Sequence, residues 1–217
     1  MRQTTKLNWL VSVLFFSGIS ISSISQTLKE VFSNSEAPLT YLGIDFSRSR
    51  LLDQGNPSEI RDKYYVSIND LIVYEPKKYD LKGAFNKSNL DHDFSAVTKN
   101  NAKANVNEIL SSEPADFNRF KASDITSIVN ELDLSGKQGV GLLFVMEAMR
   151  KIKKNSGAAI WVTLVDMKTK KILMTERIES EVAGGIGFRN YWASAIKNLI
   201  DDIHKKKYDE WKKKYGS

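Results

Sequence analysis

The chain of 217 residues contains no cysteine, two histidines and four prolines. The lack of cysteine excludes disulfide bonds, thiolate metal sites, a catalytic thiol and a lipid-modified cysteine. A Ser/His hydrolase or a histidine-ligated zinc site would rest on His92 or His204, and no supporting motif surrounds either residue. The composition, 41% hydrophobic and 27% charged, is typical of a globular protein. Collagen-like, coiled-coil and wholly disordered classes are therefore excluded.

A hydrophobic run of about 13 residues near the N-terminus is too short to span a bilayer as a helix, which takes roughly 20 residues. Arg2 and Lys6 precede the run, and the small residues Ser23 and Ser25 follow it. This order predicts a secretory signal peptide, residues 1–25, cleaved after Ser25; an uncleaved anchor is the alternative. Because no cysteine follows the run, we expect export to the periplasm or the extracellular space without a lipid anchor.

Positive charge is concentrated at the two ends of the chain. The net charge is +6, and residues 1–25 hold two cations and no acid. Residues 205–217 hold six lysines against two acids, so the part between the two ends is formally neutral. A neutral domain argues against a nucleic-acid partner. The C-terminal lysines fit a solvated helix end, and contact with an anionic envelope component is the alternative.

The first half of the chain predicts a strand, a helix and a long irregular segment. Alternating apolar residues predict a strand over 39–47, and helical spacing after an N-cap at Ser58 predicts a helix that stops before Pro76. Residues 77–123 keep no sustained period and predict mostly loop. Two short strands are expected there, near 94–97 and near 104–110.

The second half predicts a helix, a three-strand meander and a last helix. The first helix begins at Ser123 or Asp124 and ends by Gly136, and the last follows the glycines at 184, 185 and 187. Short turns, the first at 155–157, separate three predicted strands, over 142–149, 159–167 and 172–178. Both faces of the first two strands are apolar. We therefore expect the second sheet face to be covered by the middle segment or by a second copy in a homodimer.

These elements predict a single α+β domain over 39–204. Its sheet is expected to be antiparallel or mixed, with the meander near the C-terminus, helices mainly on one face and a long C-terminal helix. Residues 26–38 would form an N-terminal extension, and residues 205–217 a basic helix end.

This order of elements resembles the small α/β domain shared by the outer-membrane activators of penicillin-binding proteins and the N-terminal domain of the Tol-system translocation protein. The residues closest to that pattern are 42–46 and 162–173, where a strand ending in Asp166 is followed by a turn containing threonine. The turn has lysine where the activators usually have glycine, and the anchor cysteine is missing. The resemblance therefore does not imply a penicillin-binding protein as partner.

Residues 139–147 and 184–192 are similar to a family of uncharacterised secreted proteins of Gram-negative bacteria. That resemblance extends over about residues 40–204. It implies export but no particular activity.

Acidic residues at the ends of predicted strands are candidates for general acid/base chemistry or for binding a hard metal. Their spacing matches no metal-binding loop, and such acids are more often solvated or paired with lysine. Asp91, His92 and Asp93 form a second group, for which one histidine gives little metal affinity and a loop is the better interpretation. The four strand-end acids are Asp45, Glu147, Asp166 and Glu176.

The glycine-rich segment before the last helix is the preferred candidate binding site. Its glycines allow close backbone approach, and free amides at the helix start lie next to Arg189, which suits a phosphate or carboxylate. The order of glycines is not that of a nucleotide-binding loop, and a tight structural turn explains them equally well. The candidate residues are Gly184, Gly185, Gly187, Phe188, Arg189, Asn190 and Tyr191.

The sequence thus predicts an exported, non-enzymatic domain that binds an envelope protein or an anionic envelope component, without a cofactor or metal. The alternative is a hydrolase or ligand-binding enzyme that uses the strand-end carboxylates. A cluster of those acids in one cleft would favour the enzyme.

Overall fold

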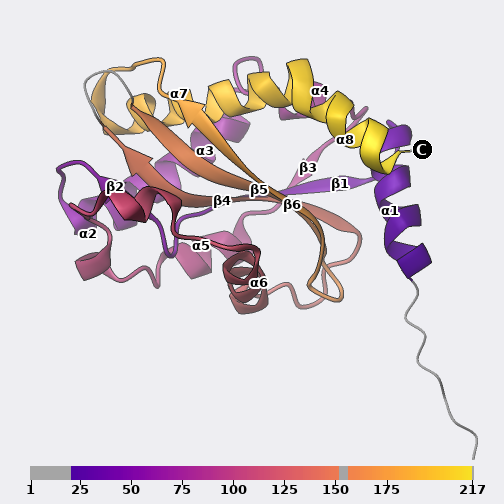
Figure 1. Ribbon diagram of the computed structural model, residues 1–217, viewed down its shortest axis with the longest axis horizontal. Coiled ribbons are helices and arrows are strands. Elements are labelled where there is room, and N and C mark those ends of the chain that lie inside the picture. The colour runs from indigo at the N-terminus through magenta and orange to yellow at the C-terminus, as the bar shows by residue number, and fades with distance from the viewer. Residues whose placement is uncertain (1–20, 152–155, 217) are drawn as a thin grey trace, which may run out of the picture.

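A six-stranded mixed sheet forms the centre of the computed structural model, which describes residues 21–151 and 156–216 (Figure 1). Most of the predicted signal peptide, residues 1–20, and Asn155 of the predicted first meander turn lie outside the described residues. The strand order is β3-β1-β4-β5-β6, and β2 pairs with the C-terminal part of β4. The strands are β1 (Leu39–Asp45), β2 (Arg50–Leu52), β3 (Asp91–His92), β4 (Val140–Arg150), β5 (Gly157–Asp166) and β6 (Lys171–Glu181).

Parallel and antiparallel pairs share this sheet. β1 runs parallel to β3 and to β4, whereas β4, β5 and β6 form the predicted antiparallel meander. The mixed sheet, the meander and the long C-terminal helix confirm the predicted fold. The α-helices are α1 (Ile21–Ser33), α2 (Pro57–Glu59), α3 (Tyr65–Tyr74), α4 (Leu81–Ala84), α5 (Ser95–Asn101), α6 (Ala122–Glu131), α7 (Gly187–Asp202) and α8 (Tyr208–Tyr215).

Shorter helical turns connect several of these helices. Two π-helical turns, η1 and η4, join α2 to α3 and α7 to α8 without a break, so the C-terminal helix is continuous from Gly187 to Tyr215. Among the described residues, no helix combines the length and the apolar character needed to cross a membrane. The turns are η1 (Ile60–Tyr64), η2 (Val106–Glu108), η3 (Pro114–Asn118) and η4 (Ile203–Lys207).

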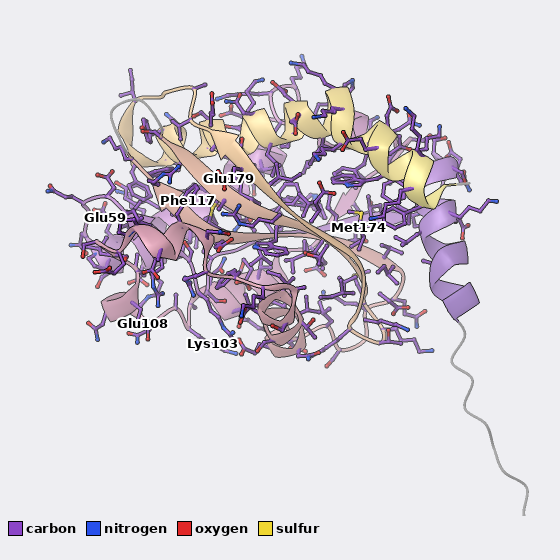
Figure 2. All side chains as sticks on the ribbon, in the orientation of Figure 1. Glu59, Lys103, Glu108, Phe117, Met174 and Glu179 are labelled. Carbon is purple, nitrogen blue, oxygen red and sulfur yellow. The ribbon has the colours of Figure 1, made fainter. Side chains whose placement is uncertain are left out.

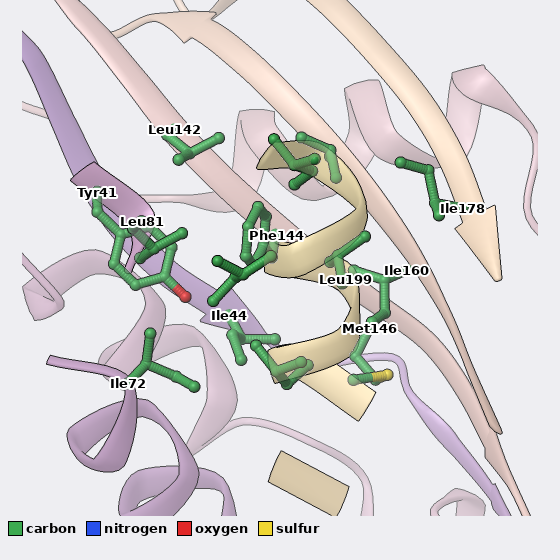
Figure 3. Packing of buried hydrophobic residues seen from close by; sticks show 14 of the residues in the cluster. Tyr41, Ile44, Ile72, Leu81, Leu142, Phe144, Met146, Ile160, Ile178 and Leu199 are labelled. Atoms are coloured by element: carbon green, nitrogen blue, oxygen red, sulfur yellow. The ribbon is translucent and has the colours of Figure 1, made fainter. Parts of the chain in front are cut away.

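Both faces of the sheet are covered, as the doubly apolar strands predict. Five of the described α-helices pack on one face and two on the other, so the helices are not confined to one face. Leu142 and Phe144 of β4 belong to the larger core with α1, α3, α4, α7 and α8 (Figure 3). Leu143 and Val145 belong to a second core on the opposite face, with α5 and α6. Because α5 and α6 come from the same chain, covering this face does not require the predicted homodimer.

The packed unit extends beyond the predicted domain limits at both ends. The ring of Phe32 in α1 lies 6.2 Å from that of Trp211 and 5.9 Å from that of Tyr215, both in α8. Phe32 and Trp211 are buried, and Figure 1 shows α1 against the end of α8. The predicted N-terminal extension and basic helix end therefore both contribute residues to the core, among them Phe32 and Trp211.

The two short strands predicted in the middle segment are wrong. Residues 95–101 form helix α5, because two consecutive asparagines at its end bond to β1. Asn101 Oδ1 accepts from Phe46 N at 2.6 Å, and Asn100 Nδ2 donates to Asp45 Oδ2 at 2.7 Å. Near 104–110 the chain forms η2 and a single bridge between Leu110 and Leu51.

Some predicted element ends differ from the structure. Asn56, not Ser58, caps α2, because its Oδ1 accepts from Ser58 N and Glu59 N. Helix α6 ends at Glu131, before Gly136, whose positive φ of 76° belongs to the following turn. Strand β2 was not predicted, because a strand of three residues is too short to show an alternating pattern of apolar and polar side chains.

Candidate functional site

Three glycines between β6 and α7 adopt conformations that other residues resist. Gly184, Gly185 and Gly187 have φ values of 112°, 148° and 77°, all in the region that favours glycine. A Cβ on Gly185 would lie 2.6 Å from the carbonyl carbon of Asn190. The close approach of this turn to the first turn of α7 thus requires glycine at 185.

The turn is fixed to the body of the protein by aromatic packing. Trp192 is only 2% exposed, and its ring lies 5.1 Å from Tyr191 and 6.2 Å from Phe188. Phe188 in turn stacks on Tyr64 of η1, with ring centroids 4.5 Å apart. These contacts hold the start of α7 against the helices that follow β2, with Trp192 packed inward.

The segment also presents an apolar side chain to solvent. Ile186, between Gly185 and Gly187, is 94% exposed. Its neighbours Phe188 and Tyr191 are half-buried. An isoleucine in this position contributes nothing to the core, so the chain displays it at the tip of the turn between β6 and α7.

A cleft of about 260 Å³ lies beside this turn. Lys151 contributes the cation of the cleft: its Nζ lies 3.6 Å from Asp53 Oδ2 and 5.2 Å from the centre of the Tyr191 ring. The cleft therefore contains a lysine already paired with a carboxylate. The residues around it are Asp53, Gln54, Lys151, Gly185, Gly187, Phe188, Tyr191 and Trp192.

The structure brings together only part of the predicted site. Gly184, Arg189 and Asn190 are not among the residues that line the cleft. Arg189 is exposed, and its Nε donates to Asn190 Oδ1 at 3.2 Å. Because the lysine that does line the cleft is paired, the geometry favours an apolar contact surface over an anion site.

Sequence reasoning missed Ile186, Lys151 and Asp53. Ile186 could have been found from its place between two glycines, where an apolar side chain has no element to pack against. Lys151 and Asp53 lie far from the turn along the chain, and no local pattern connects them to it.

Glu147, one of the strand-end acids, is fully buried and fully hydrogen-bonded. Its Oε1 accepts from the backbone N–H groups of Arg119 and Phe120, and its Oε2 accepts from Trp161 Nε1 at 3.0 Å and Arg177 Nε at 2.7 Å. Four donors satisfy this carboxylate. Its role in the fold is to join β4, β5, β6 and the segment before α6.

Asp45 is buried in a different place and has different partners. Ser47 N and Oγ donate to Asp45 Oδ1, and Asn100 donates to Oδ2. Burial raises the pKa of Asp45, and the hydrogen bonds from Asn100 and Ser47 partly offset that rise. These bonds fix the turn after β1 to α5.

The other two strand-end acids also have separate partners. Asp166 Oδ1 accepts from Thr169 N in the turn between β5 and β6. Glu176 accepts from Lys207 Nζ at 2.8 Å and from Trp211 Nε1 at 2.6 Å. The four acids thus accept hydrogen bonds from four separate sets of donors. These contacts do not bring the four carboxylates together in the cluster that the enzyme alternative needs.

Asp91, His92 and Asp93 lie at the edge of the sheet. Asp91 and His92 form the exposed strand β3, and Asp93 pairs with Lys137 and accepts from Ser95 N. Over residues 21–151 and 156–216, no group of three or more histidine, aspartate and glutamate side chains is arranged to hold a metal ion.

A scan of the chain against protein-family models finds no match, and a search of the curated proteins finds no similar sequence.

Proposed function

We propose that the chain is an exported, non-enzymatic binding domain of the bacterial envelope that engages a protein partner through residues 184–191 and the adjoining cleft. The observation that carries this proposal is the 94% exposure of Ile186 on a turn held by Gly185. An exposed apolar side chain of this size can enter a partner's pocket, and the packing of Phe188 on Tyr64 and Trp192 fixes the start of α7 beside it.

The chemistry around Ile186 supports a protein partner. Phe188 and Tyr191 keep exposed surface, and Arg189 projects beside them. Aromatic residues and arginine are enriched in the energetic centres of protein interfaces. An anionic envelope component would instead need an unpaired cation in the cleft, and Lys151 there is next to Asp53.

Export is supported by the N-terminal pattern. The predicted cleavage site after Ser25 lies within α1 (Ile21–Ser33), ahead of the α1 residues that the core uses. Leu28, Val31 and Phe32 are buried, and all three lie after the predicted cleavage site at Ser25. Cleavage would therefore leave intact the described contacts of α1 with the C-terminal helix. The resemblance to secreted Gram-negative proteins points the same way.

Affinity capture from envelope extract tests the binding surface. We expect the wild-type protein to retain a discrete protein, Ile186→Asp to lose it, and Arg189→Ala to retain it more weakly, because an interface arginine can contribute about 2 kcal/mol. All variants should keep the wild-type unfolding midpoint, since both side chains are exposed.

The matched control is Tyr74→Asp. Tyr74 is 80% exposed at the far end of α3 and lies outside the proposed surface. Capture that survives Ile186→Asp, or that Tyr74→Asp removes equally, would contradict the proposal. Unfolding of Arg189→Ala would show that this arginine is structural.

A further inference from the structure

A polar cleft of about 370 Å³, here named the β1 cleft, lies at the carboxyl end of strand β1. Residues 47–50, which directly follow β1, form one wall. Asn100 at the end of α5, Lys103 just beyond it and Glu108 of η2 form another (Figure 2 labels Lys103 and Glu108). The volume lies within the range of small-molecule binding sites.

The β1 cleft has the position in which sheets with parallel strands bind ligands. Strands β1 and β3 are parallel neighbours. The connection after β1 leads to α3 on one face of the sheet, and the chain after β3 enters α5 on the other face. Ligands of open α/β sheets bind outside the carboxyl ends of the strands, where neighbouring connections separate in this way.

The turn that forms the first wall is held by backbone hydrogen bonds. Ser49 N donates to Phe46 O at 3.0 Å and closes the turn, and Phe46 N donates to Asn101 Oδ1 at 2.6 Å. Arg119 Nη2 donates to Arg48 O. The backbone that carries Arg48 is therefore in place before a ligand binds, which lowers the entropic cost of binding.

Two arginines on this wall have donors to spare. Arg48 Nη2 donates to Ser127 Oγ and to Glu131, and Arg50 Nη2 donates to Glu108. Nη1 of both arginines has no hydrogen-bond partner among the described residues, and neither Nη1 atom is buried. These donors are therefore accessible to a ligand.

Lys103 adds a third cation to the β1 cleft. Its side chain is exposed, and no hydrogen bond or ion pair to a described residue engages its Nζ. In contrast to Lys151 beside the glycine turn, this lysine keeps all three of its donors for a ligand.

The two acids that line the β1 cleft lie closer to solvent than Arg50. The side chains of Glu108 and Glu131 are 55% and 46% exposed, whereas those of Arg50 and Arg48 are 18% and 35% exposed. Ion pairs with such exposed carboxylates contribute little to stability, so an anion can compete for the arginines. Three cations against two acids leave the lining with a net positive charge.

We propose that the β1 cleft binds the phosphate group of a small phosphate monoester, with Arg48 and Arg50 on one side of the phosphate and Lys103 on the other. A phosphate has oxygens that accept from several directions, as cations on two walls require. A carboxylate has only two oxygens, which a single arginine satisfies. The site is separate from residues 184–191 and does not depend on the function proposed for them.

Titration of the purified protein at constant ionic strength tests the ligand class, with glycerol 1-phosphate, inorganic phosphate and acetate as probes. Binding is followed by the backbone amide signals. We expect glycerol 1-phosphate to bind at least as tightly as inorganic phosphate and at least about tenfold more tightly than acetate, because it engages more charged donors. The shifted signals should belong to residues 46–50 and 100–108.

Two lysine variants from the same part of the chain identify the contact. Lys103→Gln should weaken binding of glycerol 1-phosphate about tenfold and keep the unfolding midpoint, because the side chain is exposed and unpaired. Lys99→Gln is the matched control: it removes the same charge from α5, but Lys99 pairs with Asp133 and does not line the cleft. It should change the affinity by less than about twofold.

Four results would overturn the proposal. These are no saturable binding of glycerol 1-phosphate at millimolar concentration, equal affinity for acetate, binding of inorganic phosphate without binding of the monoester, and equal weakening by Lys99→Gln and Lys103→Gln. The last result would mean that the overall charge of the protein, and not the β1 cleft, attracts the anion.

Discussion

At the residue scale, Gly185 and Gly187 share a positive φ but differ in the room around them. A Cβ on Gly185 would meet the Asn190 backbone at 2.6 Å, whereas one on Gly187 would have no heavy atom within 4 Å. Gly187→Ala should therefore cost only the backbone strain, about 1–3 kcal/mol. Gly185→Ala should cost about 1–3 kcal/mol more, because α7 must also shift.

Urea unfolding of the two alanine variants measures this difference. Gly185→Val, with a β-branched side chain, should be less stable than Gly185→Ala. Equal losses for Gly185→Ala and Gly187→Ala would show that the close approach to Asn190 does not constrain the turn.

Sequence reasoning at this scale succeeded where the cause is local. Three glycines before a helix indicate a tight turn, and all three have a positive φ. It failed for Gly43 in β1, which also has a positive φ. There Asn69 of α3 bonds to both Ile44 N and Ile44 O, and a partner 25 residues away leaves no local pattern.

At the element scale, Glu147 holds three strands and a loop together. It is paired with Arg177 of β6, which also donates to Phe117 O at 2.7 Å and to Glu179 Oε1 at 2.7 Å (Figure 2 labels Phe117 and Glu179). Glu147→Gln should lower the free energy of unfolding by about 3–5 kcal/mol, because Arg177 loses its buried counter-charge and the one remaining oxygen can accept from only one of the two pairs of donors.

Glu179→Gln is the matched control, since it removes the exposed partner of the same arginine. It should cost no more than about 1 kcal/mol. Chemical denaturation measures the free energy of unfolding of both variants. A similar loss for Glu147→Gln and Glu179→Gln would contradict the structural role of Glu147.

Glu176 links β6 to the C-terminal helix and makes that link dependent on pH. Burial opposes ionisation, but the hydrogen bonds from Lys207 and Trp211 outweigh it, so the pKa of Glu176 lies below its usual value of 4.5. Because the folded pKa is lower than the unfolded one, the stabilisation is fully present above about pH 4.5. It is lost as the pH falls through the folded pKa.

The measurement is the free energy of unfolding between pH 6 and pH 3, for the wild type and Glu176→Gln. We expect the wild type to lose stability more steeply than the variant below about pH 4.5, with the gap between the two narrowing at low pH. Parallel curves would mean that Glu176 contributes no pH dependence.

The elements that sequence predicted well are those whose burial repeats with a regular period. Strands β4 and β5 and helices α3 and α7 bury several residues each, so tertiary packing reinforces the local pattern. Helix α5 was mistaken for a strand because the bonds of Asn100 and Asn101 to β1 stabilise it, and these bonds involve residues 55 apart in sequence.

At the scale of the whole molecule, the two ends of the described chain are joined. Tyr208 of α8 donates to Phe32 O of α1, and Lys87 Nζ donates to Asn34 O, just beyond the end of α1. The composition of residues 205–217 predicts a solvated basic helix end, because six of these residues are lysines. The two aromatic residues among them, Tyr208 and Trp211, are nevertheless buried. The domain is therefore larger than the periodic segments indicate.

The proposed export predicts a mature chain that begins at Gln26. Mass spectrometry of the protein recovered from the envelope fraction should show this N-terminus, and the protein should unfold cooperatively, because Leu28, Val31 and Phe32 remain. Recovery of an intact chain with Met1 from the cytosol would refute export.

The proposed binding surface is tested most directly by photo-crosslinking in cells. A photoreactive phenylalanine derivative replaces Ile186 in one strain and Tyr74 in another, since both side chains are exposed, at 94% and 80%. The proposed function predicts a crosslink from position 186 to one envelope protein and none to that protein from position 74. Absence of a discrete product at 186, or the same product from both positions, would contradict it.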